Sequence, residues 1–196
     1  MDVPMQVPET SDVKSPAYFA HILLYTKKFQ EMVDWYCHFL GAKVMGASGN
    51  VAFVTYDDEH HRIAIIETPD YKDREPNSVG MGHFAFNYAS LDDLIHQYER
   101  LKAEGVMPAR TINHGPTTSM YYRDPEENAV EIQVDNFPSV DALNEWFATG
   151  EFNRNPIGVT FDFEDLVARR RTGEPEEVLL QPLEGDTAAP LAASDK

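Results

Sequence analysis

Three side chains in this sequence have the types and the placement of metal ligands. His21 and His83 each stand at the start of a short apolar run, and each run is followed by a helical pattern that ends at a glycine. Glu131 lies inside the apolar run AVEIQV, where an unpaired carboxylate would be costly to bury. Two imidazoles and one carboxylate with open coordination positions suit non-haem Fe(II), and also Mn, Co or Zn. We therefore predict one metal site made by these three residues.

The alternation of side chains along strands indicates which way these ligands point. In HFAFNY, the aromatic residues Phe84 and Phe86 share one face, so His83 lies on the opposite face. In AVEIQV, Glu131 lies opposite its apolar neighbours, and His21 holds the matching place in its own run. Because the apolar faces must form the core, we expect all three ligands on the surface around which the sheet curls.

The ligands belong to two stretches that repeat the same order of elements. Residues 17–68 and 81–135 each show a strand, an amphipathic helix and three further strands, and residues 69–80 between them are rich in turn formers. The first helix is expected to end at Gly41 and the second to begin at Ser90. We predict an α+β fold, in which two tandem βαβββ modules form a curved mixed sheet around a metal-binding cleft.

The two ends of the chain show other patterns. Residues 1–16 contain three prolines and several polar residues, which indicate a flexible lead. Residues 137–183 contain two short helical patterns, the first capped by Ser139. They predict a C-terminal helical extension that covers a face of the repeat or joins a subunit interface. Residues 184–196 have the composition of a disordered tail.

The composition argues against several classes of function. The chain has 196 residues, of which 33 are acidic and 16 basic, and its formal net charge is -17. This excess of negative charge disfavours binding to nucleic acid or to an anionic membrane surface. The sequence shows neither a run of 18 apolar residues nor the pattern of a secretion signal. Because Cys37 is the single cysteine, we expect no disulfide framework, and the cytoplasm is the expected compartment.

The duplicated βαβββ order, with a histidine at the start of each module, resembles the vicinal oxygen chelate superfamily. That superfamily includes glyoxalase I, fosfomycin- and bleomycin-resistance proteins, methylmalonyl-CoA epimerase and the type I extradiol ring-cleavage dioxygenases. The resemblance covers about residues 17–135 and is greatest to a single-domain extradiol dioxygenase. It implies that His21, His83 and Glu131 are the metal ligands.

The same resemblance implies three catalytic residues. The stretch DDEHHRIAI is similar to the motif that carries a non-ligand catalytic histidine on the last strand of the first module, which gives that role to His61. His114 and Tyr121 match a histidine and a tyrosine that precede the terminal glutamate. In such an enzyme, the first histidine exchanges protons with the substrate, and the other two residues hydrogen-bond its oxygen. The implied cofactor is Fe(II), or Mn(II) as a second candidate. The implied substrates are a catechol and O2, and a homodimer or larger assembly is expected.

Three points stay open from the sequence. His60 and His61 have opposite parity, so a register slip of one residue would exchange their roles. The 46 residues from His21 to Glu67 nearly equal the spacing between the two ligands of the second module. A fourth ligand at Glu67 would indicate an isomerase or lyase of the glyoxalase or epimerase type. A metal-free binding protein of the resistance type is the third alternative.

The chain also departs from the pattern of the dioxygenases that it resembles. Many of them have two such domains, whereas this chain has room for one. The loop between His114 and Tyr121 is shorter than usual. In the turn DPEEN, where glycine is common, Asn128 is expected to accept the left-handed conformation. These departures bear on the fit of the substrate more than on the class of reaction.

Overall fold

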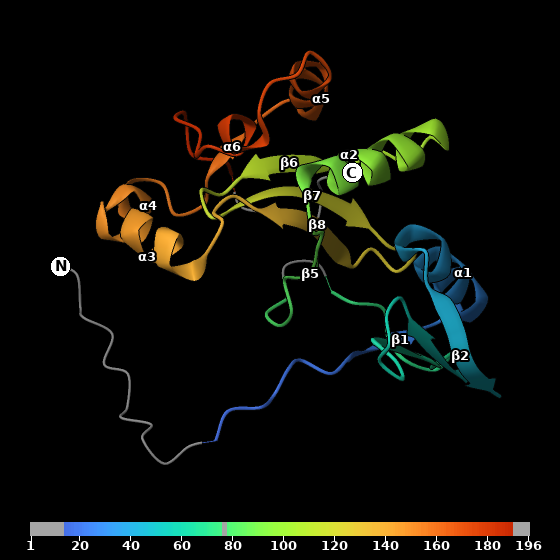
Figure 1. Ribbon diagram of the computed structural model, residues 1–196. Coiled ribbons are helices and arrows are strands. Elements are labelled where there is room, and N and C mark those ends of the chain that lie inside the picture. Colours follow the sequence, from blue (N-terminus) through green and yellow to red (C-terminus); the bar gives the residue numbers. More distant parts are fainter. Residues whose placement is uncertain (1–13, 76–77, 190–196) are drawn as a thin grey trace.

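The computed structural model describes residues 14–75 and 78–189, which form an α+β protein with two mixed sheets of four and five strands (Figure 1). Residues 1–13 of the predicted lead and residues 190–196 of the predicted tail lie outside the described residues. The elements follow in this order: β1 (Ile22–Thr26), α1 (Phe29–Leu40), β2 (Lys43–Ser48), β3 (Val51–Thr55), β4 (Ile63–Glu67), β5 (His83–Asn87), α2 (Leu91–Ala103), β6 (Arg110–Asn113), β7 (Thr117–Arg123), β8 (Ala129–Asp135), α3 (Val140–Ala148), α4 (Glu151–Arg154), β9 (Val159–Thr160), α5 (Phe163–Arg171) and α6 (Glu176–Leu179).

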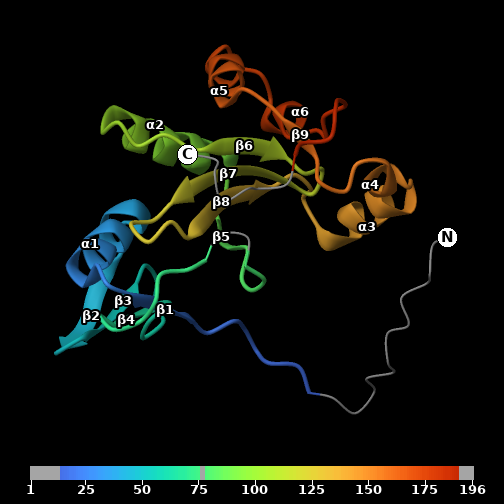
Figure 2. The same ribbon diagram turned by 180° about the vertical axis from the view of Figure 1, so that it is seen from behind.

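The two sheets are connected in the same way, as a repeat requires. The first has the strand order β1-β4-β3-β2, and the second has the order β5-β8-β7-β6 with β9 added at its edge. In each module, the strand that opens the module runs parallel to the strand that closes it. Seen from behind, α1 lies at one end of the molecule, and α3 and α4 lie at the other (Figure 2). The predicted fold class and the repeated order are confirmed, with the strands divided between two sheets.

One end of each long helix lies where the local sequence indicates. α1 ends at Gly41, which has a left-handed φ of 63° that suits glycine. α2 begins after Ser90, whose hydroxyl accepts a hydrogen bond of 3.1 Å from the backbone N–H of Asp93. Asp92 and Asp93 in the first turn also match the positive end of the helix dipole. Local capping therefore sets the end of α1 and the start of α2.

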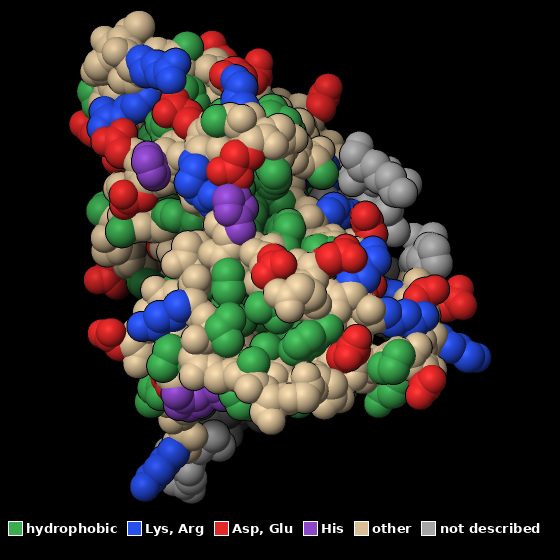
Figure 3. Space-filling view, turned by 90° about the vertical axis from the view of Figure 1, so that its right-hand side faces the viewer, with side chains coloured by type: hydrophobic (Ala, Val, Ile, Leu, Met, Phe, Trp, Pro, Cys, Tyr) green, Lys and Arg blue, Asp and Glu red, His purple; other side chains and the backbone are tan. Residues whose placement is uncertain are grey.

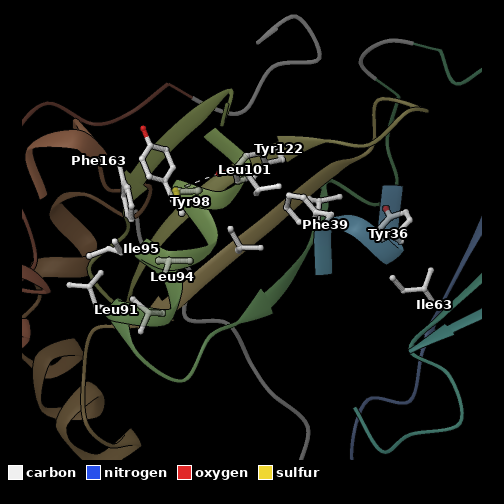
Figure 4. Packing of buried hydrophobic residues seen from close by; sticks show 14 of the residues in the cluster. Tyr36, Phe39, Ile63, Leu91, Leu94, Ile95, Tyr98, Leu101, Tyr122 and Phe163 are labelled. Atoms are coloured by element: carbon white, nitrogen blue, oxygen red, sulfur yellow. Dashed lines mark hydrogen bonds between the residues drawn. The ribbon is translucent and has the colours of Figure 1, made fainter. Parts of the chain in front are cut away.

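One hydrophobic core joins the two modules. Tyr36 and Phe39 of α1 are fully buried, and the ring of Phe39 lies 5.1 Å from that of Tyr122 on β7. Figure 4 shows Phe39 and Tyr122 near Leu101 on the buried face of α2, with Tyr36 farther from that helix. Because α1 of the first module packs on strands of the second, the two modules hold each other in place.

The turn between β7 and β8 ties the second module to α1 by hydrogen bonds. Asp124 is 2% exposed and accepts a hydrogen bond of 2.8 Å from the Tyr36 hydroxyl. It also accepts bonds from the backbone N–H groups of Glu126 and Asn128, at 2.9 Å each. The carboxylate of Glu126 accepts hydrogen bonds from the Thr26 hydroxyl and from the backbone N–H of Lys27, just before α1 begins. This turn therefore positions the end of α1 relative to the second sheet.

The left-handed residue of this turn is Glu127, with φ 63°, so the prediction of Asn128 for that conformation is wrong. The reason is that both the backbone N–H and the side-chain amide of Asn128 are used to hold Asp124. The left-handed position therefore falls one residue earlier, on a side chain that is not suited to it.

Glu127→Gly is expected to raise the free energy of unfolding by about 0.5–1 kcal/mol. A left-handed non-glycine residue costs roughly 1–2 kcal/mol, and glycine gives part of this back through its larger loss of chain entropy. Urea denaturation followed by circular dichroism measures the change. The matched control is Glu126→Gly, which removes the bonds before α1 and should destabilise the protein. Destabilisation by both variants would contradict the prediction.

The C-terminal extension packs along the edge of the second sheet. β9 pairs with β6 in antiparallel register, and the ring of Phe163 on α5 lies 4.9 Å from that of Tyr98 on α2. Ala188 is buried, and its N–H donates a hydrogen bond of 2.8 Å to the carbonyl of Gly158. Ala188 thus packs against the protein, although it belongs to the segment 184–196 whose composition indicates disorder.

The surface combines charged and apolar groups. Figure 3 shows one side of the molecule, where acidic and basic side chains stand beside one another and hydrophobic side chains gather between them. Within residues 14–75 and 78–189, no helix has both the length and the apolar character needed to cross a bilayer.

Candidate active site

The predicted site residues of the strands lie on the sheet faces that α1 and α2 do not cover. On β5, His83 is exposed, whereas Phe84 and Phe86 are partly buried against the core. On β1, Leu23 and Tyr25 are exposed on the corresponding face, at 43% and 52%. The structure confirms the predicted parity, so each module presents an open face to possible ligands.

His83 and Glu131 are direct neighbours on the open face of the second sheet. β5 pairs with β8 so that Ala85 lies opposite Glu131, and Nε2 of His83 lies 2.9 Å from Oε2 of Glu131. Burial, with 4% of Glu131 exposed, would raise the pKa of this carboxyl, but hydrogen bonds from His83 and Ser119 hold it below its ordinary value. The bond to Glu131 in turn raises the pKa of His83. The site therefore contains a buried, ionised carboxylate that can face a cation.

Tyr121 and His114 stand beside this pair. Tyr121 lies opposite Glu131 in the register of β7 and β8, and its ring lies 5.4 Å from that of His83. Its hydroxyl lies 2.8 Å from Nε2 of His114, which is 3.9 Å from Oε1 of Glu131. Burial lowers the pKa of His114 and raises that of Tyr121, so both groups are neutral at pH 7. This hydrogen-bonded pair would lie beside a molecule held next to Glu131.

His21 and His61 form a second group, on the first module. His21 directly precedes β1. The His61 ring lies 4.4 Å from the ring of His21 and 4.5 Å from the ring of Phe53. Burial and the neighbouring imidazoles lower the pKa of His61. His61 lies in the turn before β4, not on the strand as expected, because the pairing of β4 begins at Ile63. The imidazole against His21 is that of His61, whereas the side chain of His60 is 70% exposed.

The structure thus brings the six predicted site residues together as two groups. One consists of His83, Glu131, His114 and Tyr121, and the other consists of His21 and His61. In the part of the chain that the structure describes, three or more His, Cys, Asp or Glu side chains do not gather into one metal site. His21 is therefore not placed with its two predicted co-ligands. The donor types still fit a divalent cation of the first transition row, because a buried anionic carboxylate stands beside an imidazole.

Glu67 does not lie on the face that carries the site. It pairs with Thr26 of β1, and Ile63 and Ile65, which share its side of β4, are fully buried beneath α1. The alternative in which Glu67 is a fourth metal ligand is therefore wrong. The spacing in the sequence is misleading because the connections within the two modules differ in length.

The register identifies the true counterpart of Glu131 in the first module. Glu131 lies opposite Ala85, two residues after the first histidine of its module. The residue opposite Leu23, the equivalent position after His21, is Ala64. An alanine therefore stands where a fourth protein ligand would be placed, and the first module supplies no carboxylate there.

Two further groups contact these site residues, and neither was predicted from the sequence. Ser119 hydrogen-bonds Glu131, and strand parity could have identified it, since Ser119 and Tyr121 share a face of β7. The main-chain carbonyl of Ile157 lies 2.5 Å from Nδ1 of His114. No residue pattern indicates this contact, because a main-chain group of a distant segment provides it.

Comparisons with known proteins agree with this architecture. Residues 18–132 match the profile of a family described as "Glyoxalase/Bleomycin resistance protein/Dioxygenase superfamily". The chain is 43% identical over 145 residues to a protein of Rhodococcus globerulus named biphenyl-2,3-diol 1,2-dioxygenase 2, which covers 74% of this chain and 76% of that protein. It is 38% identical over 162 residues to biphenyl-2,3-diol 1,2-dioxygenase 3 of the same organism, covering 82% and 85%.

Solved structures show the same fold at lower identity. A glyoxylase/bleomycin resistance protein/dioxygenase domain from Frankia sp. EAN1pec matches with a TM-score of 0.52 and 19% identity, over 66% of this chain and 99% of that chain. A lactoylglutathione lyase from Agrobacterium tumefaciens matches with a TM-score of 0.50 and 19% identity, over 62% and 96%. At this identity the likeness shows the fold alone.

Proposed function

Because this chain belongs to the glyoxalase/bleomycin resistance protein/dioxygenase superfamily, we propose that it is a metal-dependent extradiol dioxygenase, which opens the aromatic ring of a catechol with O2. Both curated relatives are named as dioxygenases of an aromatic diol. Both atoms of O2 enter the ring-opened product, so the reaction requires no external reductant. Fe(II) is the expected metal, and Mn(II) can use the same ligand types.

The observation that carries this proposal is the register that places Ala64 at the position equivalent to Glu131. A fourth protein ligand would leave fewer positions on the metal for substrate, as suits an isomerase. Three protein ligands would leave more of them open. These positions would admit the two oxygens of a catechol together with O2, so the residues present suit a dioxygenase better than an isomerase.

We assign His21, His83 and Glu131 as the residues that would hold the metal. The buried, ionised Glu131 beside His83 meets the chemical requirement for a divalent cation. His21 would supply the third donor from the first module, so metal binding would link the two groups of site residues. When bound, the metal supplies a common centre at which the catechol and O2 exchange electron density.

The remaining site residues would act on protons and hydrogen bonds. Neutral His61 would take the proton of a catechol hydroxyl and return one later, since its lowered pKa leaves it a base at pH 7. His114 and Tyr121 would orient the substrate oxygen through their hydrogen-bonded pair. Exposed Leu23 and Phe53 on the open face of the first sheet would contact the aromatic ring.

Oxygen uptake tests the proposal. Protein loaded anaerobically with Fe(II) is mixed with a panel of catechols that begins with biphenyl-2,3-diol, the diol in the names of both relatives, and air is then admitted. We expect one O2 consumed per catechol and a yellow ring-opened product. A chelator should abolish the uptake, and Fe(II) but not Zn(II) should restore it. Tightly bound Fe(II) with no uptake across the panel would contradict the proposal.

A further inference from the structure

The loop of residues 155–158, between α4 and β9, contacts the candidate site from beyond the part of the chain that matches the family, which ends at residue 132. The carbonyl oxygen of Ile157 lies 2.5 Å from Nδ1 of His114. A carbonyl oxygen can accept a hydrogen bond but cannot donate one. Nδ1 must therefore carry the proton of the neutral imidazole.

This proton position sets the direction of the next hydrogen bond. An imidazole protonated at Nδ1 has an unprotonated Nε2, which accepts. The Tyr121 hydroxyl, 2.8 Å from Nε2 of His114, therefore donates its proton to that atom. The same hydroxyl is within hydrogen-bonding range of Glu131, and it has one proton to donate. While His114 receives this proton, the Tyr121 hydroxyl does not donate to Glu131, so that carboxylate keeps one more lone pair for another partner.

The loop is held in a fixed shape. The side chain of Asn155 accepts a bond of 2.9 Å from the N–H of Gly158 and donates one of 3.1 Å to its carbonyl. Gly158 has a φ of 97°, and a Cβ there would lie 2.2 Å from the carbonyl oxygen of Asn113 and 2.6 Å from Cα of His114. The loop thus packs directly on the backbone of His114, at a place where glycine alone fits.

We propose that residues 155–158 are a positioning element of the active site, in which Gly158 and the Ile157 carbonyl set the tautomer and orientation of His114. This inference rests on the proposed dioxygenase function. Through His114, the loop directs the Tyr121 proton away from Glu131. The Glu131 carboxylate then remains available to the metal, and the Tyr121 oxygen remains available to accept a bond from the catechol.

The first test compares two glycine variants of the full-length, Fe(II)-loaded protein. Gly158→Ala should lower kcat roughly 10–100-fold, as changes behind the ligands of metal sites do, and should change KM less than about 3-fold. Gly173→Ala is the matched control, because Gly173 has a similar φ of 92° with nothing within 4 Å of the added Cβ. Equal losses in both variants would show general backbone strain and overturn the proposal.

A double-mutant cycle separates positioning from a general structural effect. If Gly158 acts through His114, Gly158→Ala should cause no further loss of kcat in a His114→Ala background. The same fold loss in both backgrounds would overturn the proposal. Asn155→Ala serves as a second variant if Gly158→Ala does not fold, since it loosens the loop without adding an atom. It should lower kcat in the same direction, and it should also have no effect once His114 is alanine.

The tautomer itself provides a result that does not depend on turnover. Nitrogen-15 NMR of the full-length chain without added metal should show His114 protonated at Nδ1, and Gly158→Ala should reduce that population while Gly173→Ala does not. An unchanged His114 tautomer in Gly158→Ala would contradict the proposal. If the wild-type protein consumes no O2 with any catechol, the dioxygenase function fails, but these spectra still decide whether the loop positions His114.

Discussion

Glu131→Ala is expected to lower kcat/KM for the best catechol by more than about 100-fold. Replacing a residue that only supports a metal ligand costs up to about 100-fold, and the loss of a ligand should cost more. Glu131 is the carboxylate of the predicted ligand set, and it is 4% exposed and 2.9 Å from His83. Its removal takes away the negative charge that balances the cation, and leaves His83 without its partner. The variant should therefore also lose bound iron. Initial rates of O2 uptake and iron analysis of the purified protein measure both effects.

Glu67→Ala is the matched control for this experiment. Glu67 lies on the side of β4 that faces α1, where it pairs with Thr26, and the counterpart of Glu131 in the first module is Ala64. We therefore expect Glu67→Ala to bind Fe(II) as the wild-type protein does and to keep its activity within about 2-fold. A loss of iron in Glu67→Ala as large as that in Glu131→Ala would mean that the register argument is wrong and that a fourth ligand exists.

Asp124→Ala is expected to lower the free energy of unfolding by roughly 3–5 kcal/mol. The carboxylate of Asp124 accepts bonds from the Tyr36 hydroxyl and from two backbone N–H groups of its own turn, all at 2.8–2.9 Å. Alanine would leave these buried donors without an acceptor and would release the turn from α1. Because the turn links the modules, the loss should appear as one cooperative shift of the urea midpoint.

Two further variants make the Asp124 result specific. Tyr36→Phe removes one of the donors and should cost about 1–2 kcal/mol. Glu145→Ala changes an exposed acidic residue of α3, and it should alter stability by less than about 0.5 kcal/mol. If Asp124→Ala were no more destabilising than Glu145→Ala, the turn between β7 and β8 would not hold the modules together.

Features that depend on near neighbours in the chain could be predicted from the sequence. The ends of the helices at Gly41 and Ser90 follow from backbone conformation and side-chain capping. The exposed face of His83 follows from the alternation of side chains in a strand. The repeat of the βαβββ order follows from two such patterns in succession, which is why the fold class could be predicted as well.

Features that depend on pairing between distant segments could not be predicted in this way. Glu67 has nearly the same spacing from His21 as Glu131 has from His83, but the strand register assigns the equivalent position to Ala64. The left-handed residue is Glu127 and not the predicted Asn128, because Asn128 is hydrogen-bonded to Asp124. These outcomes depend on the lengths of loops and on competition for hydrogen bonds, neither of which is visible in residue types.

The contact of Ile157 with His114 is likewise a contact between distant segments that the sequence does not predict. It is made by a main-chain carbonyl, which every residue has, and by a segment 43 positions away in the sequence. A glycine can mark a place where two backbone segments lie close together, so Gly158 is a weak indication of such a contact. The segment that it contacts, however, is known only once the fold is known. The resemblance to a family could thus suggest a role for His114, whereas the contact of its Nδ1 with the Ile157 carbonyl could not be predicted.

The most direct test of the central claim is an anaerobic Fe(II) titration of wild-type, His21→Ala and His38→Ala proteins. The claim is that His21 of the first module and His83 and Glu131 of the second hold one metal together. We expect one Fe(II) per chain in the wild type, binding weakened more than about 100-fold in His21→Ala, and unchanged binding in His38→Ala, whose half-exposed imidazole pairs with Glu104. Fe(II) binding by His21→Ala with wild-type affinity would contradict the claim, because the metal would then not join the two modules.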